Sequence, residues 1–377
     1  MSAYQALYRK YRPQTFDDVS GQMAVTQTLK TQIMTGKMSH AYLFTGSRGT
    51  GKTSCAKILA KAVNCLNPDH GNPCNVCEAC KAIDSGSCMD VLEIDAASNN
   101  GVDNIRALRD EAIFSPASVK KRVYIVDEVH MLSIAAFNAL LKILEEPPEH
   151  LMFILATTEL RKVPATILSR CQRYSFRRLD TEVISKHLDY IAAQEGFKLT
   201  HEASELLARL ADGGMRDAIS LLDQCSNSPV IDEATVLEAT GLAGNRRVAS
   251  LLSAIGKRDA GAALDIFASL WRDGKDPASL LSDLCALMRD VLLLDLAPGR
   301  ALLSGAYDDK TLRAFARSFT RAELLRNMRR AQEALSSLRD NPSPRTAVEI
   351  CLVTLCDPGI AADLPELDAR VYGAAFT

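Results

Sequence analysis

The sequence lacks the features that would place it outside the ordinary globular proteins. No apolar run approaches the length of a membrane span, and residues 1–12 are polar and basic without the apolar centre of a secretion signal. A strong charge excess is also missing, because 44 Lys and Arg stand against 46 Asp and Glu, and we find no convincing internal repeat. These absences predict a cytoplasmic chain with no membrane partner and no attraction of its whole surface to nucleic acid.

The chain has 377 residues, of which 47% are hydrophobic and 24% charged, enough to bury two or three domain cores. Its charge is uneven, since residues 1–60 hold eight Lys or Arg against two Asp or Glu. A local basic face could therefore meet phosphates. A run such as 120–122 (Lys-Lys-Arg) is also compatible with a solvated strand edge.

Residues 46–53 read Gly-Ser-Arg-Gly-Thr-Gly-Lys-Thr, a complete phosphate-binding loop. Glycines allow backbone N–H groups to wrap phosphates, while a lysine neutralises the terminal ones and a hydroxyl binds Mg²⁺. The strand-like residues 41–44 precede the loop and the helical residues 54–62 follow it, which disfavours a plain turn. We expect the loop to bind ATP through Gly46, Ser47, Arg48, Gly49, Thr50, Gly51, Lys52, Thr53 and Ser54.

About seventy residues later, the apolar run 123–126 ends in two adjacent carboxylates, Asp127 and Glu128. Such a strand end suits Asp127 for Mg²⁺, together with Thr53, and Glu128 for polarising the attacking water. The alternative is an acidic strand end without a catalytic role. With the phosphate loop, the pair predicts an ATPase.

Four of the eleven cysteines fall in one short segment: Cys65, Cys74, Cys77 and Cys80. This Cys-x8-Cys-x2-Cys-x2-Cys spacing supplies the four thiolates of a closed, structural Zn²⁺ site. Disulfides are the competing interpretation, which an intracellular chain disfavours. The metal would fold an insertion too small to have its own core.

Five short apolar segments alternate with helical ones up to about residue 178, which predicts a mostly parallel sheet with helices on both faces. Between the third and fourth strands, Ser133 should cap an amphipathic helix over 134–145, which Pro147 and Pro148 end. The expected strands are 41–44, 90–94, 123–126, 152–156 and 173–176.

After residue 178 the strand signal disappears, and the rest of the chain should be helical. Helices are expected over 181–194, 200–211, 217–225 and 232–239 and, after a break at 241–245, over 248–255, 260–271, 277–294, 312–319, 321–339 and 345–355. We predict a nucleotide-binding domain over 1–178 with a zinc module at about 64–82, a helical domain over 179–243, a longer helical domain over 244–363 and a loose tail over 364–377.

Three further positions bear on the type of ATPase. Arg170, in a Ser-Arg-Cys triplet, is placed to reach a nucleotide on a neighbouring subunit, although an exposed arginine paired with a carboxylate is the plain alternative. Thr157 and Thr158 could bond the terminal phosphate or the water, or simply cap their strand. Arg216 could reach the phosphates from the second, helical domain, or only neighbour Asp217 on a helix face.

With these motifs, the chain resembles the gamma/tau family of bacterial DNA polymerase III subunits, which are AAA+ clamp-loader ATPases. The resemblance is dense over residues 4–225 and general beyond them. It is carried by the phosphate loop, the four cysteines and residues 8–13, 16, 21–22, 93–98, 127–132, 138–142, 144–149, 156–158, 169–171 and 216–218.

The resemblance implies an AAA+ αβα sandwich. It also implies that the helical domain over 179–243 is a lid and that the one over 244–363 is a collar through which five loader subunits oligomerise. It implies that Arg170 acts in trans, with Thr157 as first and Arg216 as second sensor. It places four residues near the adenine and sugar: Arg9, Arg12, Pro13 and Val19. It also implies that three residues near helix N-termini face the primer-template backbone: Asn99, Asn100 and Lys142.

The implied function is to open a ring-shaped sliding clamp with ATP and load it onto primer-template DNA. The implied partners are the beta clamp, delta-like and delta-prime-like subunits, and further copies of the chain. As a polymerase III component it would be classed with DNA-directed DNA polymerases, although it has no polymerase site.

Other functions stay open at this stage. They are another AAA+ DNA-processing ATPase such as a branch-migration motor, a structural loader subunit with weak or no ATPase activity, and a small-molecule kinase with a phosphate-binding loop.

Overall fold

The computed structural model describes residues 5–240, 245–296, 303–304, 307, 309–338, 342–357 and 359. The chain divides into two compact units, Met1–Asp232 and Glu233–Thr377. Throughout the described part, no helix combines the length and the apolar character needed to cross a membrane.

The first unit is built on a five-stranded parallel sheet with the strand order β2-β3-β4-β1-β5. All five predicted strands are confirmed. Parallel neighbours need crossover connections, and helices supply them here. The strands are β1 (Ala41–Thr45), β2 (Val91–Asp95), β3 (Arg122–Asp127), β4 (Leu151–Thr157) and β5 (Gln172–Ser175).

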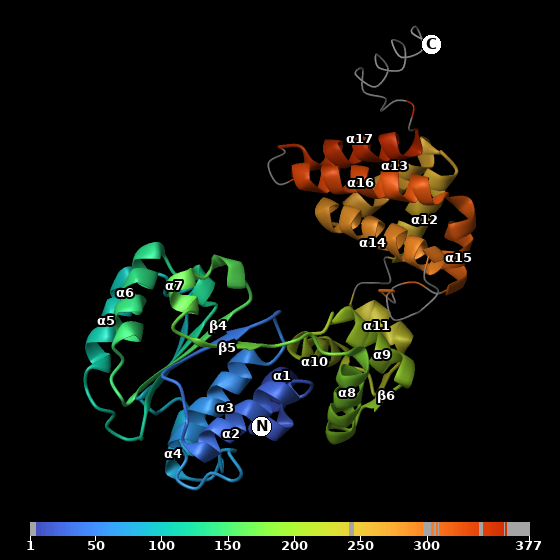
Figure 1. Ribbon diagram of the computed structural model, residues 1–377. Coiled ribbons are helices and arrows are strands. Elements are labelled where there is room, and N and C mark those ends of the chain that lie inside the picture. The colour runs from blue at the N-terminus through green and yellow to red at the C-terminus, as the bar shows by residue number, and fades with distance from the viewer. Residues whose placement is uncertain are drawn as a thin grey trace. The chain divides into compact units, whose positions relative to one another are not determined.

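Helices cover both faces of this sheet (Figure 1). Alternate residues of β3 serve opposite faces, because successive side chains of a strand point to opposite sides. Val123 and Ile125 join the core beneath α2 (Met23–Thr35) and α3 (Lys52–Asn64). Tyr124 and Val126 join the core beneath α5 (Val102–Ala112), α6 (Ile134–Glu145) and α7 (Ala165–Leu168). The predicted αβα sandwich is confirmed.

Local signals fix the ends of α6 as the sequence predicts. The Ser133 hydroxyl accepts a hydrogen bond from the N–H of Ala136, which satisfies one of the free donors of the first turn. Six short helical elements lie outside the predicted ones: α1 (Leu7–Lys10), η1 (Phe16–Asp18), α4 (Glu78–Asp84), η2 (Val129–Met131), η3 (Leu160–Lys162) and α7.

The first unit ends in a helical region that also contains a short pair of strands. Its helices are α8 (Thr181–Glu195), α9 (His201–Leu210) and α10 (Met215–Cys225), and α8 ends at Gly196, whose φ of 80° favours glycine. The expectation that no strand follows residue 178 is wrong, because β6 (Lys198–Leu199) pairs in parallel with β7 (Val230–Ile231). Two-residue strands are too short to leave a periodic signal.

In the second unit, all regular elements of the described residues are helices, as predicted, with an apolar core that includes Leu284, Leu287 and Met288. The helices are α11 (Glu233–Ala239), α12 (Asn245–Gly256), α13 (Ala260–Arg272), α14 (Pro277–Leu296), α15 (Asp309–Ser318), α16 (Arg321–Ser337) and α17 (Pro344–Cys356). The tail over 364–377, residue 339 of one predicted helix and most of the break at 241–245 lie outside the described residues. The separation of lid from collar stays a prediction.

Candidate nucleotide site and four-cysteine centre

The phosphate loop lies between the end of β1 and the start of α3. Gly46 has a φ of 149°, and a Cβ there would lie 2.4 Å from the carbonyl oxygen of Phe176. Gly49 has a φ of 75°, and its Cβ would lie 3.0 Å from the Cα of Gly214, at the start of α10. Both positions therefore require glycine, and the second brings the helical end of the unit against the loop.

Lys52 is buried within the loop, with 5% of its surface exposed. Its ammonium donates to the carbonyl oxygens of Gly46 and Ser47, at 2.8 Å each. Burial lowers the pKa of Lys52, and the charges of Glu128 and Asp127 oppose that shift. The loop therefore holds a buried ammonium bonded to backbone carbonyl oxygens, an arrangement that favours an anionic ligand.

The two sequence motifs meet at Thr53 and Asp127. The Thr53 hydroxyl donates to Asp127 Oδ2 at 2.7 Å, so residues 74 positions apart in the chain lie in direct contact. A hydroxyl and a carboxylate oxygen side by side are the hard donors that Mg²⁺ prefers. The donor set fits the metal that the sequence predicts here.

Glu128 occupies a sparsely populated backbone region, with a φ of 47° and a ψ of 46°. Such a conformation costs a non-glycine residue free energy and is frequent at functional sites. Its Oε2 accepts hydrogen bonds from the N–H and the hydroxyl of Thr158, at 3.1 and 2.9 Å. Thr158 rather than Thr157 thus contacts the second carboxylate.

Thr157 is fully buried, and its hydroxyl contacts a residue to which the sequence analysis assigned no role. Its Oγ1 lies 3.0 Å from His130 Nδ1 and accepts the N–H of Glu159 at 3.0 Å. His130 also lies 3.2 Å from Glu128 Oε2. Its position in the motif 127–132 was visible in the sequence, but its contacts depend on the neighbouring strand.

Arg170 follows α7, in the short segment that leads to β5. Its guanidinium donates to Glu145 Oε1 at 2.6 Å and to the carbonyl oxygen of Thr166 at 2.9 Å. The side chain is one-third exposed. It is thus paired with a carboxylate within the chain, while its exposed fraction leaves it open to a partner.

Arg216 lies in the first turn of α10. Its guanidinium stacks over the ring of Tyr8, with 4.8 Å from the Cζ atom to the ring centroid. Hydrogen bonding to Arg9 and, to a lesser extent, to Arg216 lowers the pKa of Tyr8. In this structure Arg216 therefore faces the N-terminal helix α1, while Gly214, just before it in the chain, lies against Gly49 of the phosphate loop.

The residues expected near the adenine and sugar flank the start of α3. Arg12 Nε donates to the Ser54 hydroxyl at 3.3 Å, and Val19 Cγ1 would lie 3.6 Å from a Cβ at Gly51. Pro13 adjoins Arg12 in the chain, and Arg9 is exposed.

A buried amide that the sequence analysis left without a role fixes the same region. Gln22 Nε2 donates to the carbonyl oxygens of Thr50, at 3.3 Å, and Arg177, at 2.7 Å. Its side chain thereby ties the phosphate loop to the segment after β5. Because its partner Arg177 is 155 residues away, local sequence gives no signal for this contact.

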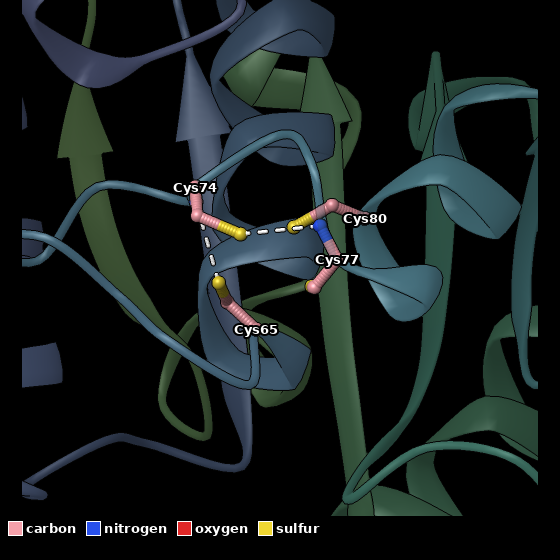
Figure 2. Close-up of side chains that lie close together, drawn as sticks. All are labelled: Cys65, Cys74, Cys77 and Cys80. Carbon is pink, nitrogen blue, oxygen red and sulfur yellow. Dashed lines mark hydrogen bonds between the residues drawn. The ribbon is translucent and has the colours of Figure 1, made fainter.

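The four cysteines that spacing brought together also meet in space (Figure 2). All four sulfur atoms lie within 4.8 Å of one another. Cys65 Sγ accepts the N–H of Cys74 at 3.3 Å, and Cys74 Sγ accepts the N–H of Cys77 at 3.4 Å. Four converging sulfurs with N–H donors to two of them form a group that could bind a metal ion, and the all-sulfur donor set fits Zn²⁺.

The pKa values of these thiols are shifted in opposite directions. The N–H of Val76 lowers the pKa of Cys74. Burial alone would raise the pKa of Cys77, yet hydrogen bonds from the backbone of Leu66 and Cys80 and from the neighbouring thiols bring it down to about 6. Burial raises the pKa of Cys65 and of Cys80. The lowered pKa values of Cys74 and Cys77 favour the thiolate, the form that binds metal.

Of the three residues expected to lie near helix N-termini and face DNA, two lie there and one does not. Asn99 and Asn100 lie just before α5, and the N–H of Ser133 donates to the carbonyl oxygen of Asn100, so the N-termini of α5 and α6 meet there. The expectation that Lys142 lies near a helix N-terminus is wrong, because this exposed lysine is in the last turn of α6.

Three family models match successive parts of the chain. Residues 21–180 match the model "DNA polymerase III, delta subunit". Residues 183–226 match "DNA polymerase III clamp loader subunit, ATPase lid domain", and residues 231–371 match "DNA polymerase III subunits gamma and tau domain III".

Curated DNA polymerase III subunits are also similar to this chain, over nearly its whole length. A Bacillus subtilis DNA polymerase III subunit tau is 46% identical over 97% of this chain and 66% of its own length. The gamma/tau subunit of Mycobacterium tuberculosis is 41% identical over 94% of this chain and 63% of its own. The Escherichia coli tau subunit is 38% identical over 93% and 55%. The chain thus spans less than two thirds of the length of these relatives.

Proposed function

Because the chain belongs to the gamma/tau family of DNA polymerase III subunits, we propose that it is an ATPase subunit of a clamp loader. In this function, ATP binding and hydrolysis open a ring-shaped sliding clamp and place it on primer-template DNA. The observation that carries the proposal is the 2.7 Å contact between Thr53 and Asp127, which joins both ATPase motifs in one site.

The phosphates of ATP would lie on the N–H groups of residues 46–53 and at the N-terminus of α3, where the helix dipole favours anions. Lys52 would exchange its carbonyl partners for phosphate oxygens. Thr53 and Asp127 would hold Mg²⁺, whose charge offsets the charge of the phosphates.

Glu128 is the residue we assign to the attacking water. Its carboxylate orients that water and takes its proton while the water oxygen bonds to the terminal phosphorus and the bond to the leaving ADP oxygen breaks. Both hydrogen bonds from Thr158 go to Oε2 and hold the carboxylate in place, so we assign the contact with the water to Oε1. Thr157, buried beside His130, would act as the first sensor through the same cluster.

One arginine of the same chain and one of a neighbouring subunit would bind ATP more strongly than ADP. The bound nucleotide would thereby change how strongly the subunits associate. Arg216 would turn from Tyr8 toward the phosphates of its own chain. Arg170 would leave Glu145 and reach the phosphates of a neighbouring subunit. The proposed neighbours are further copies of this chain and delta-like and delta-prime-like subunits.

DNA would meet the inner face of the assembled subunits through its backbone. Asn99 and Asn100 offer polar groups beside two helix N-termini, and Lys142 adds a positive charge at the far end of α6. Contacts of this kind position the duplex without reading its sequence. We further propose that the four cysteines hold a structural Zn²⁺, and that the protein works in the cytoplasm, where bacterial DNA is replicated.

The test of this proposal is Arg170→Ala in the assembled complex with clamp and primed DNA. We expect ATP binding to stay within about twofold, while stimulated turnover falls by about 10³-fold or more, as for other arginine fingers. The matched control is Arg161→Ala, which removes an exposed arginine from the segment between β4 and α7. Stimulated turnover that survives Arg170→Ala contradicts the role in trans, and turnover that primed DNA stimulates without any clamp favours another DNA-processing ATPase.

A further inference from the structure

A buried lysine joins the four-cysteine segment to the N-terminal part of the chain. Lys61, on α3, donates from Nζ to Gln14 Oε1 at 2.6 Å and to Asn75 Oδ1 at 2.8 Å. Its Nζ also lies 3.5 Å from Asp84 Oδ1, on α4, and only 3% of its side chain is exposed. A buried ammonium must keep its partners, so Lys61 fixes these three residues relative to one another.

Asn75 connects this lysine directly to the cysteines. It lies between Cys74 and Cys77 with a φ of 58°, a conformation that asparagine tolerates better than most residues. Its Nδ2 donates to the carbonyl oxygen of Gln14 at 3.3 Å, in addition to the bond that its Oδ1 accepts from Lys61. The turn that brings the two sulfurs together therefore also directs the Asn75 amide.

A second asparagine of the same segment makes a parallel set of contacts. Asn72 is 8% exposed, its Oδ1 accepts the N–H of Phe16 at 2.9 Å, and its Nδ2 donates to Asp17 Oδ2 at 2.7 Å. Lys30, on α2, also pairs with Asp17 at 2.7 Å. Residues 14–17 are thus held by several bonds from the four-cysteine segment.

The opposite side of this N-terminal segment faces the phosphate loop. Arg12 donates to Ser54 at 3.3 Å, and Val19 lies against Gly51. Gln14 Nε2 donates to the carbonyl oxygen of Arg12 at 3.2 Å, which joins the two sides. Residues 12–19 therefore lie between the cysteine segment and the proposed nucleotide site.

We propose that the four-cysteine segment holds residues 12–19 in place for the nucleotide, with Lys61 and Asn75 as positioning residues, so that metal occupancy and nucleotide affinity are coupled. The inference rests on the proposed function in placing the nucleotide at the phosphate loop. Because coupling between two ligands is reciprocal, bound nucleotide should also slow the loss of metal.

The test compares two lysines on α3 in the full chain. Lys61→Met keeps the aliphatic stem and removes the ammonium, whereas Lys57→Met removes a partly exposed lysine whose partner is Glu93. Binding of a fluorescent ADP analogue, hydrogen exchange of residues 12–19 and zinc content are measured for both. We expect Lys61→Met to weaken ADP binding about tenfold and to speed exchange, as loss of two buried hydrogen bonds would, while Lys57→Met changes neither.

Two more measurements keep the result interpretable. Asn75→Gly removes the amide at a backbone conformation that glycine accepts, and serves if Lys61→Met fails to fold. Removing zinc from the wild type with a mercurial reagent and a chelator should weaken ADP binding about as much as Lys61→Met, and should add little in that variant. An unchanged ADP affinity in a folded Lys61→Met or Asn75→Gly variant overturns the inference.

The two proposals fail in different ways. A wild-type chain that binds no ADP analogue overturns the proposed nucleotide site and this inference with it. A wild-type chain that binds the analogue with the same affinity before and after zinc removal overturns the coupling alone.

Discussion

The two units of the chain differ in what they bury. Of the fourteen buried polar or charged residues among those the structure describes, twelve lie in Met1–Asp232 and two, Asp290 and Asn327, in Glu233–Thr377. Burying a polar group costs free energy unless the group is hydrogen-bonded, so buried polar residues are expected mainly where they bind a ligand or hold a structural contact. In the first unit several surround the phosphate loop, whereas the second unit is mainly apolar helix packing.

Because the two units differ in this way, we expect them to respond differently to substitution. Substitutions of the polar residues around the phosphate loop in the first unit should abolish ATP hydrolysis while the unit stays folded. Changes in the core of the second unit should cost stability while nucleotide binding persists.

The largest expected effect is that of Glu128→Gln. Without a carboxylate to take the proton of the attacking water, single-turnover hydrolysis should fall by about 10²- to 10⁴-fold, while ATP binding stays within about threefold. The matched control is Glu159→Gln, which neutralises a half-exposed carboxylate 3.4 Å from His130. Hydrolysis at the wild-type rate in Glu128→Gln would remove this residue from the mechanism.

The next effect concerns the second unit. Leu284 is fully buried on α14, so Leu284→Ala should lower the free energy of unfolding of this unit by about 2–5 kcal/mol through lost burial and the cavity left behind. Hydrogen exchange of α12, α14 and α16 would measure it. Leu325→Ala, at a leucine that is 46% exposed, is the control and should cost much less. If ADP affinity falls in parallel with stability, the two units do not act separately.

The smallest effect tests a buried carboxylate that is structural rather than catalytic. Asp90 Oδ2 accepts the N–H groups of Ala117 and Ser118, and Oδ1 accepts Arg122 Nη2 at 3.0 Å. Burial opposes ionisation, but the N–H of Ser118 and the Arg122 guanidinium hold the pKa of Asp90 below its usual value. Asp90→Asn should therefore cost about 1–3 kcal/mol at pH 7.

The lowered pKa of Asp90 predicts how its contribution to the free energy of unfolding changes with pH. Because the folded pKa is below the unfolded one, about 3.9, the carboxylate stabilises the fold fully above pH 4 to 5. Its contribution disappears as the pH falls through the folded pKa. Urea unfolding at pH 7 and pH 3 should show the gap between wild type and Asp90→Asn shrinking at low pH, with the exposed Asp110→Asn as control. A gap that widens on acidification would contradict this assignment.

Much of the fold was predictable because its signals are local. Short apolar runs located all five strands of the sheet, and Ser133 with its cap located the start of α6. The phosphate loop and the four cysteines were predictable for the same reason, since glycine, lysine and cysteine spacing reflects short-range geometry. The lid boundary and the roles of Arg170, Arg216 and Thr157 stay predictions.

The amino-acid sequence alone establishes which chemistry the chain carries: a loop for phosphates, two carboxylates after a strand, and four thiols within sixteen residues. The groups that complete these motifs are found only in the folded chain. Gln22 bonds to Arg177, Lys61 bonds to Gln14 and His130 meets Thr157 because sheet order and helix packing bring distant segments together. Such contacts leave no local pattern, since their free energy comes from burial that exists only once the chain has folded.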